Sequence, residues 1–241
     1  MGNLAVFDRD FPISSGILRT LMHSYNVTVT RSWNEGTPLR QQVFLENDDQ
    51  VSPFAMSSRE HTIRWKKLFV PPEEEPSVRL AKKRLKIAVV NRPVARKLLN
   101  AKEARDNLAA AFPEHHVFEH HLRGPPNVTV EEMTDFFPSV DVLVTPHGSQ
   151  LTGIMFMQRC SAVLELFPHL YYAPTYFSSL ARMFQLPHAN WYVSHDAAPS
   201  KMPDLNTRLA NTGNNMCPSM SKLVTAVDEL IQKRQDCLGL I

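Results

Sequence analysis

Residues 142–168 of this chain, V-L-V-T-P-H-G-S-Q-L-T-G-I-M-F-M-Q-R-C-S-A-V-L-E-L-F-P, decide its fold. They begin with an apolar run, residues 142–144, that is typical of a buried strand in a parallel sheet. The run breaks at residues 146–148, and apolar side chains then recur at helix spacing over residues 151–157. A second apolar run, residues 162–167, follows. The order strand, tight turn, helix, strand predicts one unit of an α/β sheet.

The turn at His147 and Gly148 lies at the carboxyl end of the first predicted strand, where open α/β sheets bind ligands. A helix that starts directly after a glycine leaves free backbone N–H groups at its end, and such an end attracts phosphate. A glycine also lets a ligand come close to the main chain. The alternative is an ordinary strand–helix–strand unit with a glycine in its turn.

Two arginines follow another predicted strand, residues 86–90. Arg92 and Arg96 carry guanidinium groups, which bind phosphate oxygens in pairs and stay charged at any relevant pH. Several cations lie nearby in the sequence, so a solvated basic patch is the alternative. We favour that alternative only for the lysines, residues 82, 83 and 97.

These two motifs together resemble glycosyltransferase family 61. The family pattern is His-Gly-Ala, a spacer, Leu-Thr-Asn and a Phe, then a strand that ends Glu-Leu-Phe-Pro; the chain has H-G-S-Q-L-T-G-I-M-F-M and L-E-L-F-P. Ser149 stands where alanine is usual, and Gly153 where asparagine is usual. The family's second motif, a strand followed by two arginines and an asparagine, matches Arg92, Arg96 and Asn100. The resemblance covers roughly residues 85–192.

The family includes protein O-linked N-acetylglucosaminyltransferases and plant xylan xylosyl- and arabinosyltransferases. The resemblance therefore implies an α/β fold with a Rossmann-like doubly wound parallel sheet, the C-terminal half of a GT-B glycosyltransferase. Residues 1–80 would be a partial N-terminal acceptor-side region with a linker at residues 71–76, and residues 81–241 the nucleotide-sugar-binding domain.

The activity that the resemblance implies is inverting, metal-independent transfer of a sugar from a nucleoside diphosphate donor, with uridine diphosphate (UDP) as the nucleotide. The acceptor would be a hydroxyl group on a protein or glycan, and no cofactor is expected. The general base is not identified by the sequence. The residues expected to bind the donor are Arg92, Arg96, His147, Gly148, Ser149, Leu151, Thr152 and Glu165.

Two of these residues have alternatives. His147 could bond to the diphosphate or only shape its turn. Glu165 is a carboxylate inside an apolar strand, and such a group is rarely buried without a partner. Its partner could be a ribose diol, or it could form a structural ion pair with Arg159 or Arg182.

No metal site is expected. His116 and His120 are four residues apart, but they lie on a predicted strand, where that spacing does not bring two side chains together as it does on a helix. The three cysteines lack metal spacing, and their odd number leaves at least one unpaired within the chain.

Composition fits a globular protein of 241 residues, of which 43% are hydrophobic and 21% charged. A net charge of +2 is too small to indicate a nucleic-acid-binding protein. No apolar run in the sequence is long enough to span a membrane. The start of the chain lacks the pattern of a signal peptide, from which we expect a fragment or shortened form of a longer protein. The resemblance implies the Golgi or endoplasmic reticulum lumen, and sequons at Asn26 and Asn127 permit such a location.

Elsewhere the pattern predicts alternating helices and strands. Helices are expected at residues 15–25, 100–112 (with Asn100 and Glu103 as a capping box), 129–137, 173–186 and 219–238, and strands at 27–32, 116–120 and 191–193. Two rival functions remain: a non-catalytic nucleotide-sugar-binding homologue and a dinucleotide-dependent oxidoreductase. Against the oxidoreductase, no G-x-G-x-x-G follows any predicted strand.

Overall fold

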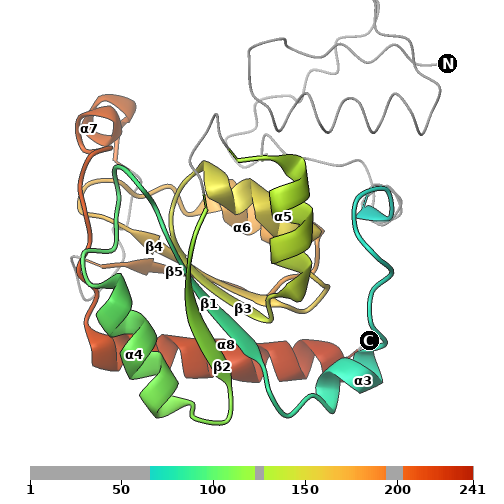
Figure 1. The fold of residues 1–241 in the computed structure, drawn as a ribbon. Coiled ribbons are helices and arrows are strands. Elements are labelled where there is room, and N and C mark those ends of the chain that lie inside the picture. Colours follow the sequence, from blue (N-terminus) through green and yellow to red (C-terminus); the bar gives the residue numbers. More distant parts are fainter. Residues whose placement is uncertain (1–65, 123–127, 194–202, 241) are drawn as a thin grey trace, which may run out of the picture.

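The computed structural model describes residues 66–122, 128–193 and 203–240 (Figure 1). Within these residues the chain forms one five-stranded sheet in the order β2-β1-β3-β4-β5, with every neighbouring pair parallel. The strands are β1 (Lys86–Asn91), β2 (His116–His121), β3 (Val142–Pro146), β4 (Ala162–Phe167) and β5 (His188–Tyr192). The sequence pattern predicted each of these strands. The last of them, β5, begins and ends earlier than the predicted residues 191–193.

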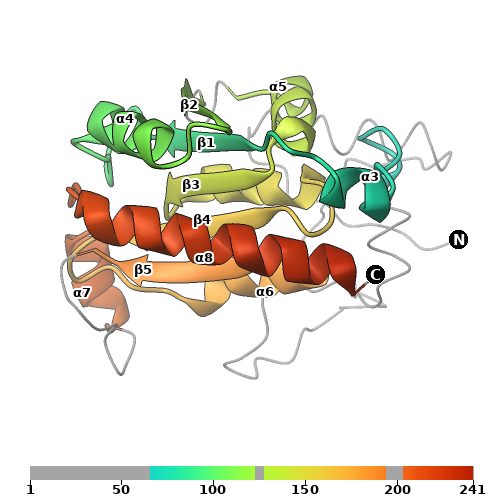
Figure 2. The ribbon, with the colours of Figure 1, turned by 90° about the horizontal axis from the view of Figure 1, so that it is seen from below.

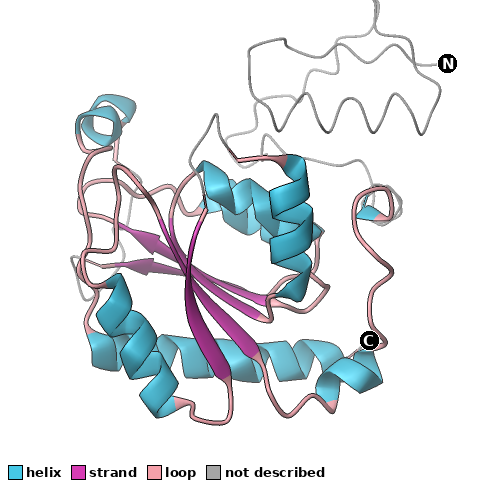
Figure 3. Ribbon diagram, in the orientation of Figure 1, coloured by secondary structure: helices cyan, strands magenta, loops and turns pink. Residues whose placement is uncertain are grey.

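Helices cover both faces of this sheet (Figure 2, Figure 3). They are α3 (Pro76–Leu80), α4 (Ala101–Ala111), α5 (Val130–Phe136), α6 (Thr175–Met183), α7 (Leu205–Ala210), α8 (Met220–Gly239) and the 3-10 helices η1 (Phe137–Ser139) and η2 (Ser149–Phe156). Helices α4 and α8 lie on one face, and α5, η2 and α6 lie on the other.

Successive residues of each central strand enter opposite cores. On β1, Ile87 and Val89 pack with α4 and α8, while Ala88 and Val90 pack with α5, η2 and α6. Because a strand alternates its side chains between the two faces of a sheet, a strand covered on both faces must be apolar throughout. This is why the apolar runs in the sequence predicted a parallel sheet, and the Rossmann-like doubly wound fold is confirmed.

Two local details differ from expectation. The segment after Gly148 is a 3-10 helix rather than an α-helix, because Gly153 weakens helical structure and the Thr152 hydroxyl bonds back to the Ser149 carbonyl at 2.6 Å. Asn100 precedes α4 without capping it: its side-chain oxygen has no hydrogen-bond partner among the described residues. Its amide donates to the Pro218 carbonyl at 3.2 Å and to Glu103 Oε2 at 3.3 Å. Thr129 does cap α5, accepting from the Glu132 N–H at 3.1 Å.

The described part of the expected N-terminal region packs onto the sheet domain. Glu73, in the proposed linker, pairs with Lys66 at 2.5 Å and with Arg159 at 3.5 Å. Arg79 of α3 donates to Ser161 Oγ at 2.9 Å. The helix expected at residues 15–25 and the strand at 27–32 lie outside the described residues, so the division into two domains stays a prediction.

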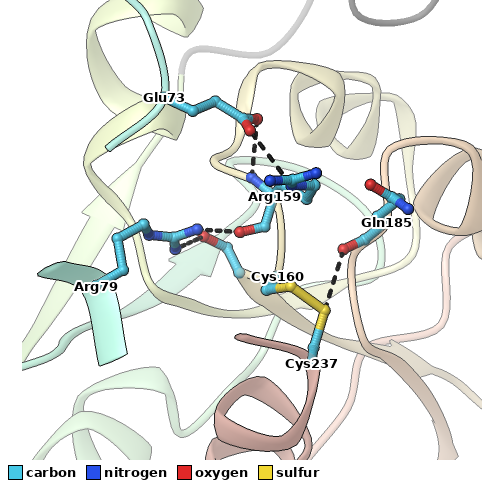
Figure 4. Close-up of a disulfide and its surroundings, with 7 residues drawn as sticks. Glu73, Arg79, Arg159, Cys160, Gln185 and Cys237 are labelled. Atoms are coloured by element: carbon cyan, nitrogen blue, oxygen red, sulfur yellow. Dashed lines mark hydrogen bonds and ion pairs between the residues drawn. A yellow bond between two sulfur atoms is a disulfide. The ribbon is translucent and has the colours of Figure 1, made fainter. Parts of the chain in front are cut away.

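Cys160 and Cys237 form a disulfide that joins the start of β4 to the end of α8 (Figure 4). Cys217 is free and exposed. The sequence left the pairing open, because it gave no sign that the end of the last helix returns to the turn before β4. Among the helices that the structure describes, none has both the length and the apolar character that a membrane span requires.

Candidate functional site

The expected site lies at the carboxyl ends of β1 and β3. These strands are neighbours, and the chain leaves β1 toward β2 on one side and returns to β3 on the other. This reversal is the topological switch point where doubly wound sheets bind ligands. The two motifs, far apart in sequence, meet at this point.

The loop after β1 is held in shape by Asn91. The Asn91 amide donates to the Leu98 carbonyl at 2.9 Å, and its Oδ1 accepts from the backbone N–H groups of Arg92 and Leu98 at 2.8 and 2.9 Å. Ala95 and Arg96 have φ values of 39° and 55°, so the chain turns tightly here in the left-handed region. This turn directs both arginine side chains back toward β3.

Arg92 and Arg96 converge on the turn after β3. Arg96 Nε donates to the His147 carbonyl at 3.0 Å, and Arg92 Nη1 lies 3.5 Å from the same oxygen. Arg92 Nη1 also donates to Gln150 Oε1 at 2.6 Å. The Arg96 guanidinium lies 4.7 Å from the ring centre of Tyr171. The structure thus brings together the arginines and the His147–Gly148 turn, as the sequence predicted for a shared site.

Neither guanidinium pairs with a carboxylate among the described residues. Burial, and then the nearby charge of Arg96, lower the pKa of Arg92 to about 10. That value still leaves Arg92 protonated at neutral pH. The carboxyl ends of β1 and β3 therefore hold two positive charges, and each guanidinium keeps its Nη2 group, with two N–H donors, without a described protein partner.

Gly148 makes room for a neighbouring side chain, which is not the reason expected from the sequence. Its φ of 163° is extended backbone, open to any residue. A Cβ atom at this position would overlap Arg92 Nη1 and lie 2.6 Å from Gln150 Oε1. The absent side chain therefore makes room for the Arg92 guanidinium, rather than directly for a ligand.

Glu165 of β4 has no exposed surface. Its Oε1 bonds to His147 Nδ1, and its Oε2 bonds to His188 Nε2 at 3.0 Å. Arg159, one of the ion-pair partners considered, pairs instead with Glu73. The two histidines occupy both carboxylate oxygens, which favours a positioning role for Glu165 over contact with ribose.

His147 is enclosed by aromatic side chains. Its ring centre lies 4.9 Å from that of Phe167, 5.3 Å from Tyr171, 5.4 Å from Phe177 and 6.0 Å from Tyr176. Only 7% of its side chain stays exposed. The turn is thus built around a fixed imidazole.

The remaining expected residues divide between surface and core. Ser149 is exposed at the start of η2. The Thr152 hydroxyl donates to the Ser149 carbonyl within the same helical turn. Leu151, also expected to contact the donor, is fully buried in the core.

Three residues of the site were not expected from the sequence. Gln150 anchors Arg92 and donates to the Pro146 carbonyl at 2.5 Å. Tyr171 stacks on Arg96, and His188 holds the second oxygen of Glu165. Gln150 lies inside the quoted motif, and Tyr171 follows the end of that motif at Pro168 by three residues. His188 gives no sequence signal, because it meets Glu165 only through the pairing of β4 with β5.

No group of three or more His, Cys, Asp and Glu side chains that could hold a metal ion occurs in the parts of the chain that the structure describes. His120, one of the residues considered, stacks on Phe136 at 4.0 Å between ring centres. Burial lowers the pKa of His120, which keeps this imidazole neutral at pH 7.

The fold is a Rossmann-like α/β domain, with two arginines gathered at its switch point. The family model described as Glycosyltransferase 61 matches residues 22–164, more than half of the chain. The chain therefore belongs to glycosyltransferase family 61, as its motifs suggested.

Other comparisons give only distant likeness. No curated protein matches the chain significantly. Among solved structures, a mutant flavo di-iron protein from Thermotoga maritima matches with 12% identity and a TM-score of 0.35, over 66% of this chain and 38% of that one. A diflavin flavoprotein from Nostoc sp. matches with 13% identity and a TM-score of 0.34, over 64% of this chain and 99% of that one.

Proposed function

We propose that the chain binds a nucleoside diphosphate sugar, with UDP as the nucleotide, and transfers the sugar to a hydroxyl group of a protein or glycan. The reaction inverts the anomeric centre and needs no metal ion. The observation that carries the proposal is the convergence of Arg92 and Arg96 on the His147 carbonyl, because it places at the switch point two cations for which the described residues offer no carboxylate partner.

The diphosphate gains negative charge as it leaves the sugar. Groups fixed in advance toward that charge stabilise the transition state, because they need no reorganisation during the reaction. Arg92 is fixed by Gln150 and the Ala95 carbonyl, and Arg96 by the His147 carbonyl and Tyr171. Their free Nη2 groups then act on the diphosphate as a metal ion does in other enzymes.

We further propose that the chain acts in the lumen of the Golgi or endoplasmic reticulum. The disulfide between Cys160 and Cys237 supports an oxidising compartment, since disulfides are rare in reducing ones. The family resemblance points to the same compartments.

A thermal-shift panel of nucleoside diphosphate sugars, with and without EDTA, tests donor binding. A ligand at one hundred times its Kd stabilises a protein by about 2.7 kcal/mol, which shifts Tm by several degrees. We expect UDP-sugars to raise Tm equally in both conditions, and an Arg92→Ala/Arg96→Ala double variant to show no shift. A shift that appears only with manganese contradicts the metal-independent site.

Turnover is measured separately, as release of UDP from the sugar that binds best. A chain that binds UDP-sugars but neither transfers nor hydrolyses them would favour the non-catalytic homologue instead. A shift with NAD or NADP alone would favour the oxidoreductase.

A further inference from the structure

The chain of contacts His147–Glu165–His188 fixes where protons lie. A carboxylate only accepts hydrogen bonds, so the ring nitrogens that face Glu165 must carry the hydrogens. In His147 that nitrogen is Nδ1. A neutral His147 therefore has a bare lone pair at Nε2, for which the described residues provide no hydrogen-bond partner.

Positive charge lies close to this imidazole. Arg92 Nη1 lies 3.5 Å from the carbonyl oxygen of His147, Arg96 Nε donates to it at 3.0 Å, and the rings of Tyr171 and Tyr176 flank the His147 ring. Burial raises the pKa of Tyr176, and Tyr171 raises it further. The carboxylate of Glu165 is the negative charge next to the ring.

A bare Nε2 cannot donate to phosphate. It can accept a proton from a hydroxyl group. This is the role of the general base, for which the sequence named no residue. In this role Glu165 holds the imidazole in the required tautomer and stabilises the imidazolium that forms, while His188 holds the other oxygen of Glu165.

We propose that His147 is the general base of the reaction and that Glu165 is its positioning residue; this rests on the proposed function. As the acceptor oxygen bonds to the anomeric carbon, its proton passes to His147 Nε2. The bond from the anomeric carbon to the diphosphate oxygen breaks, and its electron pair leaves with the nucleoside diphosphate. The His147 side chain is 7% exposed, and Tyr176, whose ring centre lies 6.0 Å from that of His147, is 41% exposed.

The tautomer is tested without any substrate. Long-range proton–nitrogen spectra of the full chain labelled with nitrogen-15 distinguish the two neutral tautomers from imidazolium, and loss of one signal in His147→Asn assigns it. We expect the Nδ1–H tautomer at neutral pH. The Nε2–H tautomer, or an imidazolium at neutral pH in the free protein, overturns the proposal.

The base role is tested with His147→Asn, whose amide can still donate to Glu165 and so keeps the turn. We expect UDP affinity by titration calorimetry to stay within about three-fold, because the arginines and not the imidazole bind the diphosphate. Release of UDP from the best-binding UDP-sugar, with water as acceptor, should fall by about a hundred-fold or more. Loss of UDP affinity in parallel would make His147 a diphosphate contact, and unchanged turnover would make it structural; either result overturns the proposal.

Two further variants separate positioning from structure. Glu165→Gln presents an amide that can donate to Nδ1, so the tautomer should change and turnover should fall while UDP affinity is kept. His116→Gln, at the exposed start of β2, is the matched control and should change none of these quantities. A wild-type chain that does not bind UDP-sugars, or never turns them over, contradicts the proposed function, whereas a wild type that turns them over no faster than His147→Asn contradicts only the base.

Discussion

The Nη1 atom of Arg92 lies in the space that a side chain at Gly148 would occupy. The same nitrogen donates to Gln150 Oε1 at 2.6 Å, so the guanidinium is held against the main chain of the turn. The arginine motif after β1 and the His-Gly motif after β3 are therefore parts of one contact. Arg92 of the first motif accounts for the glycine at position 148, and Gln150 of the second motif holds the Arg92 guanidinium in place.

We predict that Gly148→Ala acts through Arg92. The methyl group must displace the guanidinium, so UDP affinity should fall by about ten-fold or more, as in Arg92→Ala. The double variant should be no weaker than either single variant, because both remove the same contact. Titration calorimetry with UDP measures this cycle.

Ser149→Ala is the matched control for the glycine. Ser149 is exposed, its N–H remains in the variant, and alanine is the usual family residue at this position. Its UDP affinity should be unchanged. Loss of binding in Ser149→Ala together with normal binding in Gly148→Ala would show that the hydroxyl, and not the arginine-lined turn, recognises the ligand.

The second prediction concerns Arg96 and its stacking partner. Arg96→Ala should weaken UDP binding by roughly ten-fold or more, since a hydrogen bond to a charged group contributes about 1.5–3 kcal/mol. Arg96→Lys keeps the charge but loses the planar group that stacks on Tyr171 and donates to the His147 carbonyl. It should therefore recover only part of the affinity. Full recovery by lysine would mean that only the charge of Arg96 contributes to UDP affinity. Unchanged affinity in both variants would favour the alternative, in which Arg96 belongs to a solvated basic patch.

The sequence predicted the sheet well because each central strand is covered on both faces. Val142, Leu143 and Val144 are all buried, so the apolar run carries the signal of a parallel strand directly. The position of the site followed, because the carboxyl ends of parallel strands share one edge.

Side-chain partners could not be predicted in the same way. His188 reaches Glu165 only because β5 pairs with β4, and no local pattern gives that register. Leu151 lies in the core although the sequence gave it as a donor contact, because a motif does not separate the residues that pack from those that bind. The sequence left the disulfide pairing open for a similar reason, since the bond joins residues separated by 77 positions.

The third prediction concerns this disulfide. A cross-link that closes so long a loop restricts the unfolded chain, and its loss commonly costs about 2–4 kcal/mol. A Cys160→Ser/Cys237→Ser variant, and the wild type under reducing conditions, should both unfold at lower urea concentration than the oxidised wild type. Cys217→Ser is the control and should not change the transition. A wild type equally stable with and without reductant would show that the disulfide does not fasten α8 to the sheet.

The fourth prediction concerns a buried charge cluster at the amino end of β3, the opposite end from Arg92 and Arg96. Asp141, which is 3% exposed, accepts from Lys82 at 2.8 Å, from the Lys86 N–H at 2.9 Å and from Arg234 at 2.9 Å. Arg79 of α3 lies 3.8 Å from the same carboxylate. One carboxylate thus ties α3 and α8 to the edge of the sheet.

Asp141→Asn leaves Arg234 buried beside Arg79 without a counter-charge, and we expect it to lower the free energy of unfolding at pH 7 by about 3–5 kcal/mol. Burial alone would raise the pKa of Asp141, but the hydrogen bonds from Lys82 and the Lys86 N–H, together with the charge of Arg234, lower it below its ordinary value of 3.8. A lowered pKa means that the carboxylate stabilises the fold fully above pH 3.8 and that this contribution is lost as the pH falls through the folded-state value.

The difference in stability between wild type and Asp141→Asn should therefore be constant near neutrality and shrink in acid. Urea unfolding of both proteins from pH 7 downward measures it. Asp106→Asn removes an exposed carboxylate that pairs with its neighbour Arg105, and this control should cost less than about 1 kcal/mol at every pH. A difference that stayed the same in acid would mean that the asparagine disturbs packing, and that the charge of Asp141 does not hold the helices to the sheet.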